Sequence, residues 1–331
     1  MATRRPPLYS LQAGRRRHRR PTGLVVLLAA TLVAVLLLVI GAGVVLWRLL
    51  PLLDHGAGRI PPSALTGVAP VSGGQGGGLS PMRAAGASRK PVPGVTAAAA
   101  IVLDAGSGRV LWARRAHSHR PVASLTKLMT VLLAERTGGL SRAFTITPAM
   151  TGEQGYTLGL RAGQRVTVRD MLAATLIASA NDAADALAVR RSRSLTAFVS
   201  LMNREAHRLR LSDTHFSNPS GIIDSGNSSS AWDMADLTRH VLKQAVLRRL
   251  VGEKVYRRGD GGTFVSRNEL LWTYTDAIGV KTGSTTLAGD CLAAAARRNG
   301  HTLIAVVLGA HGDEFDEGAK LLDLGFRRLS G

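Results

Sequence analysis

An uncharged apolar run of 25 residues, GLVVLLAATLVAVLLLVIGAGVVLW (23–47), constrains this chain more than any other feature. About 20 apolar residues span a bilayer as a helix, because lipid offers the backbone polar groups no partners except one another. A cleavable signal peptide has a shorter apolar core of about 7–15 residues and a small-residue cleavage site. Here Arg48 and LLPLL follow instead. We therefore predict an uncleaved, single-pass transmembrane signal anchor over residues 23–50.

The charges around this run predict its orientation. Residues 1–22 hold seven arginines and no acidic residue, and the first acid of the chain is Asp54. The positive-inside rule places such a basic tail in the cytoplasm and the following chain outside the cell membrane. Without these seven charges, the formal net charge of +20 falls to +13. That excess suits an anionic envelope surface, and a solvated basic face fits it equally well. Because the basic tail is explained as a topology signal, we expect a membrane protein with no nucleic-acid partner.

The segment after the anchor divides into a linker and a folded domain. Residues 51–94 are rich in glycine, proline and serine, including GGQGGG, and predict a flexible tether. The folded, catalytic domain is expected over 95–331. It would open with a β-hairpin in 95–115 and close with strands at 277–285, 290–298 and 301–310 and a helix at 313–329. Helices are predicted between these strands, at 124–136, 167–178, from 181 onward, at 195–209 and at 231–244.

This order of elements predicts an α/β (α+β) fold. Strands at both ends of the domain can complete one antiparallel sheet flanked by helices, and the helical middle would form a subdomain. A cleft between the two parts is the natural place for a binding site.

Lysine is rare in this chain, and one lysine stands in a suggestive place. Of 42 Lys plus Arg residues only six are lysines, and Lys127 follows Ser124 by three positions in ASLTKLMT. Residues i and i+3 of a helix share a face, so the amine can reach the hydroxyl. A serine needs a neighbouring base before it becomes a good nucleophile, and arginine cannot serve because it stays protonated. The pair predicts a nucleophilic serine with a lysine base.

Two further stretches could face the same cleft. Lys281 lies next to Thr282 on a predicted strand, where it could hold a substrate carboxylate. As a nearby cation, Lys281 would also lower the pKa of Lys127. Ser179 and Asn181 fall in a break between two predicted helices, which can direct a hydroxyl and an amide into a cleft.

Taken together, these stretches resemble a known family. Ser-x-x-Lys at 124, Ser-x-Asn at 179 and Lys-Thr-Gly at 281 stand in the signature order of penicillin-binding proteins and serine β-lactamases. The flanking SANDAADALA, RNELLW and AKLLDLGF are similar to the low-molecular-weight penicillin-binding proteins, which are D-alanyl-D-alanine carboxypeptidases of the S11 peptidase type. The resemblance implies a β-lactamase/transpeptidase-like fold. It also implies a serine hydrolase that trims the terminal D-Ala from peptidoglycan stem peptides and is acylated by β-lactams.

The resemblance further implies roles for single residues. Ser124 would be the acylated nucleophile and Lys127 its base. Ser179 would relay a proton to the leaving D-alanine, and Asn181 would hold a peptide amide of the substrate.

The Lys-Thr-Gly strand would bind the substrate. By the same resemblance, Lys281 and Thr282 would hold the terminal carboxylate. The backbone N–H groups of Ser124 and Ser284 would form the oxyanion hole. Gly283 would leave room for the substrate to lie along the strand.

The chain departs from the family at two places. Ser220 stands where relatives often have histidine, and Asp313 and Glu314 stand where many have an arginine near the site. The second departure affects how a terminal carboxylate would be held.

Other functions share this chemistry. A β-lactamase of class A needs a glutamate for deacylation, and residues 214–222 (THFSNPSGI) contain no acid. A D,D-endopeptidase that cuts peptidoglycan cross-links would use the same site, and an inactive homologue that only binds the envelope would keep the same fold. No metal or other cofactor is expected, because His117 and His119 lack a third ligand at suitable spacing.

Overall fold

The computed structural model describes residues 79–222 and 226–330. The strands are β1 (Ala99–Asp104), β2 (Val110–Arg114), β3 (Ala143–Thr145), β4 (Arg165–Thr167), β5 (Val255–Arg257), β6 (Thr263–Val265), β7 (Ala277–Thr285), β8 (Gly289–Arg298) and β9 (His301–Ala310). The α-helices are α2 (Lys127–Glu135), α3 (Val168–Ala173), α4 (Asn181–Ser192), α5 (Leu195–Arg208), α6 (Ala231–Lys243), α7 (Ala245–Val251), α8 (Leu270–Thr273) and α9 (Glu314–Ser330). Short helical turns are η3 (Ala123–Thr126), η4 (Pro148–Met150) and the π-helical η5 (Ala174–Ala178).

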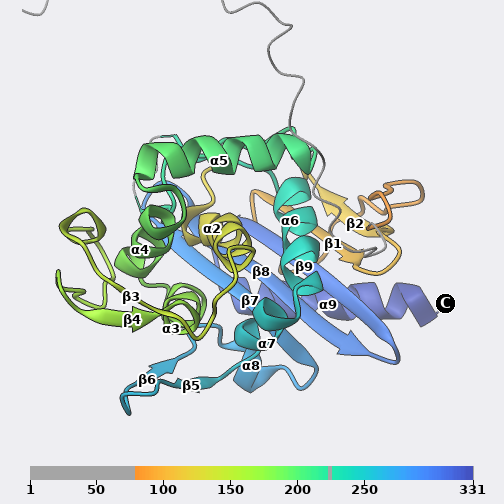
Figure 1. Ribbon diagram of the computed structural model, residues 1–331. Coiled ribbons are helices and arrows are strands. Elements are labelled where there is room, and N and C mark those ends of the chain that lie inside the picture. Colours follow the sequence, from red (N-terminus) through yellow and green to blue (C-terminus); the bar gives the residue numbers. More distant parts are fainter. Residues whose placement is uncertain (1–78, 223–225, 331) are drawn as a thin grey trace, which may run out of the picture. The chain divides into compact units, whose positions relative to one another are not determined.

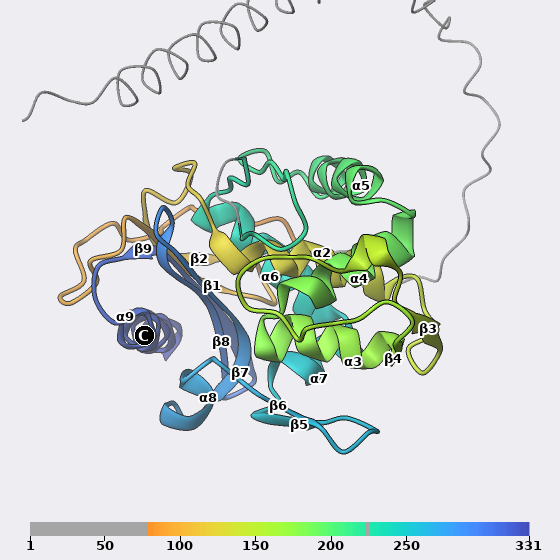
Figure 2. The same cartoon turned by 90° about the vertical axis from the view of Figure 1, so that its left-hand side faces the viewer.

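One antiparallel sheet organises this part of the chain. Its five strands run in the order β2-β1-β9-β8-β7, so the N-terminal hairpin completes a sheet begun by the C-terminal strands. Helix α9 covers one face, where Leu270 of α8 also packs, and helices α2 to α7 gather on the opposite face (Figures 1 and 2). The predicted antiparallel sheet flanked by helices is confirmed.

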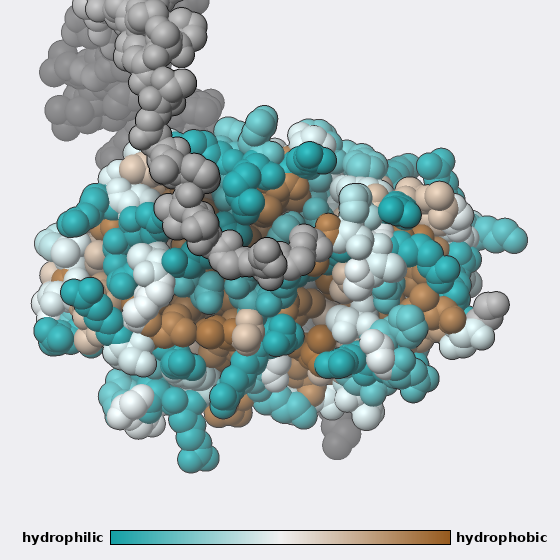
Figure 3. Space-filling model, turned by 45° about the vertical axis from the view of Figure 1, so that its right-hand side comes forward, coloured by the Kyte–Doolittle hydropathy of each residue, from teal (hydrophilic) through white to brown (hydrophobic). Residues whose placement is uncertain are grey.

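The central strand β9 shows why the sheet lies between helices on both of its faces. Leu303, Ala305 and Val307 of β9 pack with α9, whereas Ile304 and Val306 pack with the helices of the other face. A strand buried on both faces reads as a continuous apolar run instead of an alternating one, as HTLIAVVLGA does. On the surface, hydrophilic residues lie between smaller hydrophobic areas, as expected for a globular domain (Figure 3).

Local sequence signals fix several element ends. Asn299 and Gly300 have φ values of 50° and 80°, the left-handed conformations that a two-residue hairpin needs, and they join β8 to β9 as predicted. Thr167 caps α3 by accepting a hydrogen bond of 3.1 Å from the backbone N–H of Asp170. The packed region begins earlier than residue 95, since Arg83 N–H donates to Gly108 O at 2.9 Å.

The predicted tail, the transmembrane anchor over 23–50 and the linker up to residue 78 lie outside the described residues. Among residues 79–222 and 226–330, no helix combines the length and the apolarity needed to cross a bilayer.

Candidate active site

Ser124 and Lys127 lie at a junction between two kinds of helix. Ser124 belongs to the 3-10 turn η3, and the α-helix α2 starts only at Lys127, three residues later than predicted. The tighter turn still brings the two side chains together, with 2.9 Å between Lys127 Nζ and Ser124 Oγ. The predicted contact between hydroxyl and amine is therefore present.

The hydrogen bonds of Lys127 prepare its amine to accept a proton. Nζ lies 2.7 Å from Asn181 Oδ1 and 2.6 Å from the backbone oxygen of Ser220. Both oxygens only accept, so a neutral amine donates its two N–H bonds to them. The remaining lone pair then points toward the third neighbour, Ser124 Oγ. After protonation, the ammonium has three acceptors for its three N–H bonds.

The environment of Lys127 weakens its hold on a proton. Lys127 is fully buried, and burial is the main cause that lowers its pKa from 10.5 to about 7. The negative charges of Asp185 and Glu153 oppose this shift, and the cation of Arg267 adds to it. Repulsion between the amines of Lys127 and Lys281 lowers the pKa of Lys281, together with the larger effect of burial. Such repulsion between two cations is mutual, so it acts in the predicted direction on Lys127.

Ser179 and Asn181 enter the site from the break between η5 and α4. Ser179 ends the π-helix η5 in a left-handed conformation with φ of 64°, which turns the chain sharply. Asn181 is the first residue of α4 and forms no cap with its side chain, although asparagine is a residue type that often caps helices. Its amide instead accepts from Lys127 and donates to Gln154 O at 2.6 Å. The Asn181 side chain thus forms its hydrogen bonds within the site and not with the N-terminus of α4.

Lys281 connects the sheet to Ser179. It lies on β7 with 2% of its surface exposed, and its Nζ donates to Ser179 Oγ at 2.9 Å and to Thr282 O at 2.8 Å. Both lysines therefore lie behind the serines, where each amine contacts one hydroxyl.

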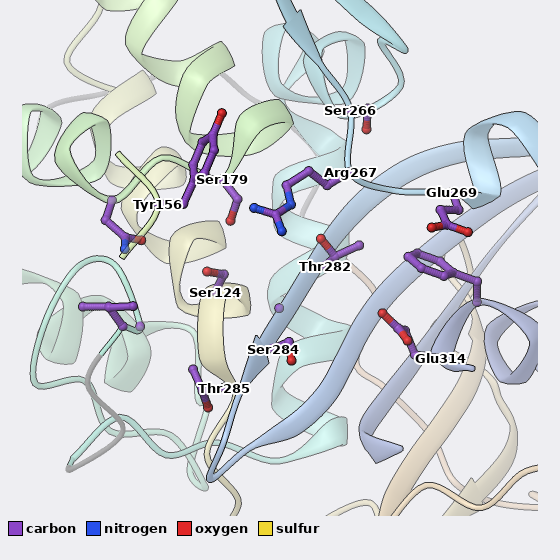
Figure 4. A pocket seen from close by; sticks show the side chains of 15 residues that line it. Ser124, Tyr156, Ser179, Ser266, Arg267, Glu269, Thr282, Ser284, Thr285 and Glu314 are labelled. Carbon is purple, nitrogen blue, oxygen red and sulfur yellow. The ribbon is translucent and has the colours of Figure 1, made fainter. Parts of the chain in front are cut away.

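A cavity of about 570 Å³ opens in front of these residues. Ser124, Ser179, Asn181, Thr282, Gly283 and Ser284 all line it, so six of the eight predicted site residues face one space. In Figure 4, Ser179 lies above Ser124 and Thr282 lies to its right, with the Arg267 side chain between these two.

Gly283 lets β7 pass directly against the turn that holds Ser124. A Cβ atom on Gly283 would lie 2.7 Å from the backbone nitrogen of Ser124, well inside normal contact. A glycine at this position therefore keeps the Ser124 N–H at the surface of the strand where a substrate carbonyl would lie. This N–H is one of the two predicted oxyanion donors, and Ser284, the other, borders the same cavity.

Several cavity residues were not predicted from the sequence. Tyr156 and Arg267 line the cavity, and the guanidinium of Arg267 lies 5.3 Å from the centre of the Tyr156 ring. Arg267 is the first residue of RNELLW, a stretch that resembles the family. This position is the sequence signal that could have indicated Arg267 as a site residue. The contact of the Ser220 carbonyl with Lys127 is a backbone contact, and the sequence holds no signal for it.

The acidic departure noted in the sequence also lies at the cavity. Glu314 and Glu269 line it together with Phe315 (Figure 4). Burial is the main cause that raises the pKa of Glu314, and the nearby charges of Asp290, Asp313 and Glu269 raise it further. One end of the cavity is thus acidic, and Arg267 provides a cation elsewhere in its wall.

Comparison with known proteins relates this arrangement to a family. The family profile described as peptidase S11, D-alanyl-D-alanine carboxypeptidase, matches residues 86–312. The D-alanyl-D-alanine carboxypeptidase DacF of Bacillus subtilis is 36% identical over 192 residues, which cover 55% of this chain and 49% of the relative. The chain spans about half or less of the length of several such curated relatives.

Solved structures share the fold at similar identity. Penicillin-binding protein 6B from Escherichia coli superposes with a TM-score of 0.68 and 32% identity, over 75% of this chain and 82% of that one. A D-alanyl-D-alanine carboxypeptidase from Mycobacterium tuberculosis does so with a TM-score of 0.68 and 30% identity, over 76% and 96%. The family profile covers more than half of the sequence and includes all three motifs. This chain therefore belongs to the S11 peptidase family of D-alanyl-D-alanine carboxypeptidases.

Proposed function

We propose that this protein is a serine-type D-alanyl-D-alanine carboxypeptidase that removes the terminal D-Ala from peptidoglycan stem peptides. The observation that carries the proposal is the fully buried amine of Lys127 at 2.9 Å from Ser124 Oγ. When this amine is neutral, it donates its two N–H bonds to Asn181 Oδ1 and Ser220 O, so its lone pair faces the hydroxyl. Such a pair suits acyl transfer through a covalent intermediate.

The geometry suggests how acylation proceeds. Ser124 Oγ attacks the carbonyl carbon between the two D-alanines as Lys127 takes its proton. The backbone N–H groups of Ser124 and Ser284 stabilise the oxyanion. The C–N bond then breaks, and the proton passes from Lys127 through Ser179 to the leaving nitrogen. Lys281 holds the Ser179 hydroxyl in place at 2.9 Å.

Deacylation can use the same base. Once its proton has gone to the leaving nitrogen, Lys127 is neutral again. Water attacks the ester carbon and gives a proton to Lys127. Lys127 passes this proton to Ser124 Oγ as the ester bond breaks, so Ser124 is released as the hydroxyl. A small D-Ala diffuses away and admits this water. The leaving group of a penicillin stays tethered in the site, so a β-lactam is expected to remain as a long-lived covalent inhibitor.

We also propose that the protein is anchored in the cell membrane by residues 23–50, with its catalytic domain outside the cytoplasm. The support is the uncharged run of 25 residues directly after seven arginines. A reporter fused after Gly331 should be active only outside the cytoplasmic membrane. Activity of that reporter in the cytoplasm would contradict this topology.

Defined muropeptides test the enzymatic proposal. Incubation of the purified protein with a pentapeptide stem should release free D-alanine. Mass spectrometry should detect the other product, the stem shortened to a tetrapeptide. Cleavage of cross-linked dimers without any D-alanine from pentapeptides would indicate a D,D-endopeptidase instead. No reaction with either substrate would favour the inactive homologue.

A further inference from the structure

Another cavity lies apart from the catalytic one, between β3, η4 and the C-terminal end of α4. Helix α4 and the β3–β4 hairpin lie together at the left of Figure 1, and they are again close to each other in Figure 2. The cavity has a volume of about 590 Å³. No residue lines both this cavity and the one that holds Ser124. The proposed reaction therefore leaves this cavity without a role.

Three arginines line this cavity, and no acidic residue does. Arg142 comes from the segment before β3, Arg190 from the last turn of α4, and Arg193 is the residue that ends this helix. Within residues 79–222 and 226–330, none of the three forms an ion pair with a carboxylate. Arg136, by contrast, is paired with Glu205 at 2.5 Å. The cavity thus gathers positive charge that no described carboxylate neutralises.

Two of these side chains converge on one spot. Arg142 Cδ and Arg190 Nη2 each lie 3.8 Å from the point that a Cβ atom on Gly139 would occupy. The Arg190 guanidinium also lies over the Phe144 ring, 5.4 Å from its centre, and this contact holds it at the cavity wall. Burial is the main cause that lowers the pKa of Arg190, and the charge of Arg142 lowers it further. An anion between the two cations would replace their repulsion by attraction.

The stability of α4 explains only part of this arrangement. A cation in the last turn of a helix interacts favourably with the helix dipole, which accounts for Arg190 taken alone. It does not account for Arg142, which belongs to a different segment and reaches the same spot. An anionic ligand accounts for both residues.

The residue types indicate which anion fits. Arginine presents a planar fork of N–H donors that matches the oxygens of phosphate with two parallel hydrogen bonds. A phosphate monoester offers three acceptor oxygens and up to two negative charges, whereas a carboxylate offers two oxygens and one charge. The hydroxyl groups of Thr137 and Thr145 border the same cavity and can donate to a further oxygen. The volume lies within the range of about 300–1,000 Å³ for small-molecule sites, so it also admits the organic group that carries the phosphate.

We propose that this cavity binds the phosphate group of a phosphate ester, with Arg142, Arg190 and Arg193 as its cationic ligands. The proposal goes beyond the proposed function and does not depend on it. A ligand held here would leave the catalytic cavity free for peptides.

A lipid surface is a poorer match for this cavity. Membrane binding through charge and burial needs exposed apolar side chains beside the cations. The exposed large hydrophobic residues of the described chain are Tyr156, Val255, Val265, Trp272 and Leu287, and none of them lines the cavity.

Calorimetric titration of the full-length protein in detergent tests the proposal. The probes are sn-glycerol 3-phosphate, inorganic phosphate and acetate, compared at equal ionic strength. The proteins are the wild type, R190Q, R142Q and the control R191Q. Arg191 is the exposed neighbour of Arg190 on α4 and does not line the cavity, so R191Q removes the same charge outside the site.

The expected result separates a built site from a basic surface. Glycerol 3-phosphate should bind one site per chain with a Kd of about 1 mM or tighter. R190Q and R142Q should each weaken this binding about 10-fold or more, because each removes hydrogen bonds to a charged group. R191Q should change it by less than about twofold, since an exposed charge is screened by salt.

Several results would overturn the proposal. No binding of glycerol 3-phosphate, or equal losses in R190Q and R191Q, would show that the cavity is no specific site. Acetate binding as tightly as glycerol 3-phosphate would remove the preference for phosphate. Tighter binding of inorganic phosphate than of the ester would contradict the assignment to an ester. Should thermal unfolding show that R190Q does not fold, the comparison of R142Q with R191Q decides by the same criteria.

Discussion

Replacing Gly283 by alanine should slow acylation by shifting a strand through less than one ångström. The new Cβ atom would lie 2.7 Å from Ser124 N, 3.2 Å from Ala123 Cβ and 3.2 Å from Leu125 N. Ordinary contacts begin at about 3.4 Å, so β7 and η3 must separate by about 0.7 Å. Two of the three contacts are backbone atoms, so no side-chain rotation relieves them.

This separation of β7 from η3 changes the geometry of the oxyanion hole. It moves Ser284 and Thr282 away from Ser124 and spoils the alignment of the two oxyanion donors. Loss of one such donor costs about 10²–10³ in rate, and a displacement near 1 Å can cost about 10². We therefore expect acylation by a fluorescent penicillin to slow by about 10²-fold. Overpacking should cost the fold about 1–3 kcal/mol, which leaves the domain folded.

Stopped-flow labelling with fluorescent penicillin measures the rate, and thermal unfolding checks the fold. Gly259→Ala is the matched control, because a Cβ on Gly259 meets no atom within 4 Å. It should acylate at the wild-type rate. Wild-type acylation in folded G283A would refute the reasoning, since the close approach of β7 to Ser124 N would then have no role.

Three further outcomes follow from the site. Lys127→Arg should lower acylation at least ~10²–10⁴-fold without unfolding the domain, because arginine stays protonated; labelling at the wild-type rate would remove Lys127 as the base. The acylation rate should rise with pH through about 7, since the lowered pKa of Lys127 leaves the amine protonated below that pH and neutral above it; a flat profile between about pH 5 and 9 would contradict this assignment. The penicilloyl-enzyme should persist while a D-Ala-D-Ala peptide turns over, and rapid catalytic loss of penicillin would indicate a β-lactamase.

The sequence predicts the sheet and most helices because their signals are local. The continuous apolar run of β9 and the Asn299-Gly300 turn each determine one element without reference to the rest of the chain. The ends of helices at the site are less predictable, because tertiary contacts decide them. Asn181 could cap α4 by residue type, but Lys127 and Gln154 engage its amide instead.

The three motifs also predict most of the site. The eight predicted residues lie in or directly behind one cavity. What the motifs could not supply is the electrostatic setting. Arg267, Glu153 and Asp185 act on Lys127 from segments far from it in sequence. One weak sequence signal could have indicated Asp185. It is an acidic residue on the buried face of α4, four positions after Asn181.

Peptide mapping of the covalent adduct tests the central claim most directly, namely that Lys127 activates Ser124 for acyl transfer. The protein is incubated with penicillin at pH 8, digested and analysed by mass spectrometry, in parallel with K127R and S124A. The account predicts one penicilloyl group, on the peptide that contains Ser124, in the wild type and none in either variant. An adduct on any other residue, or undiminished modification of Ser124 in K127R, would contradict it.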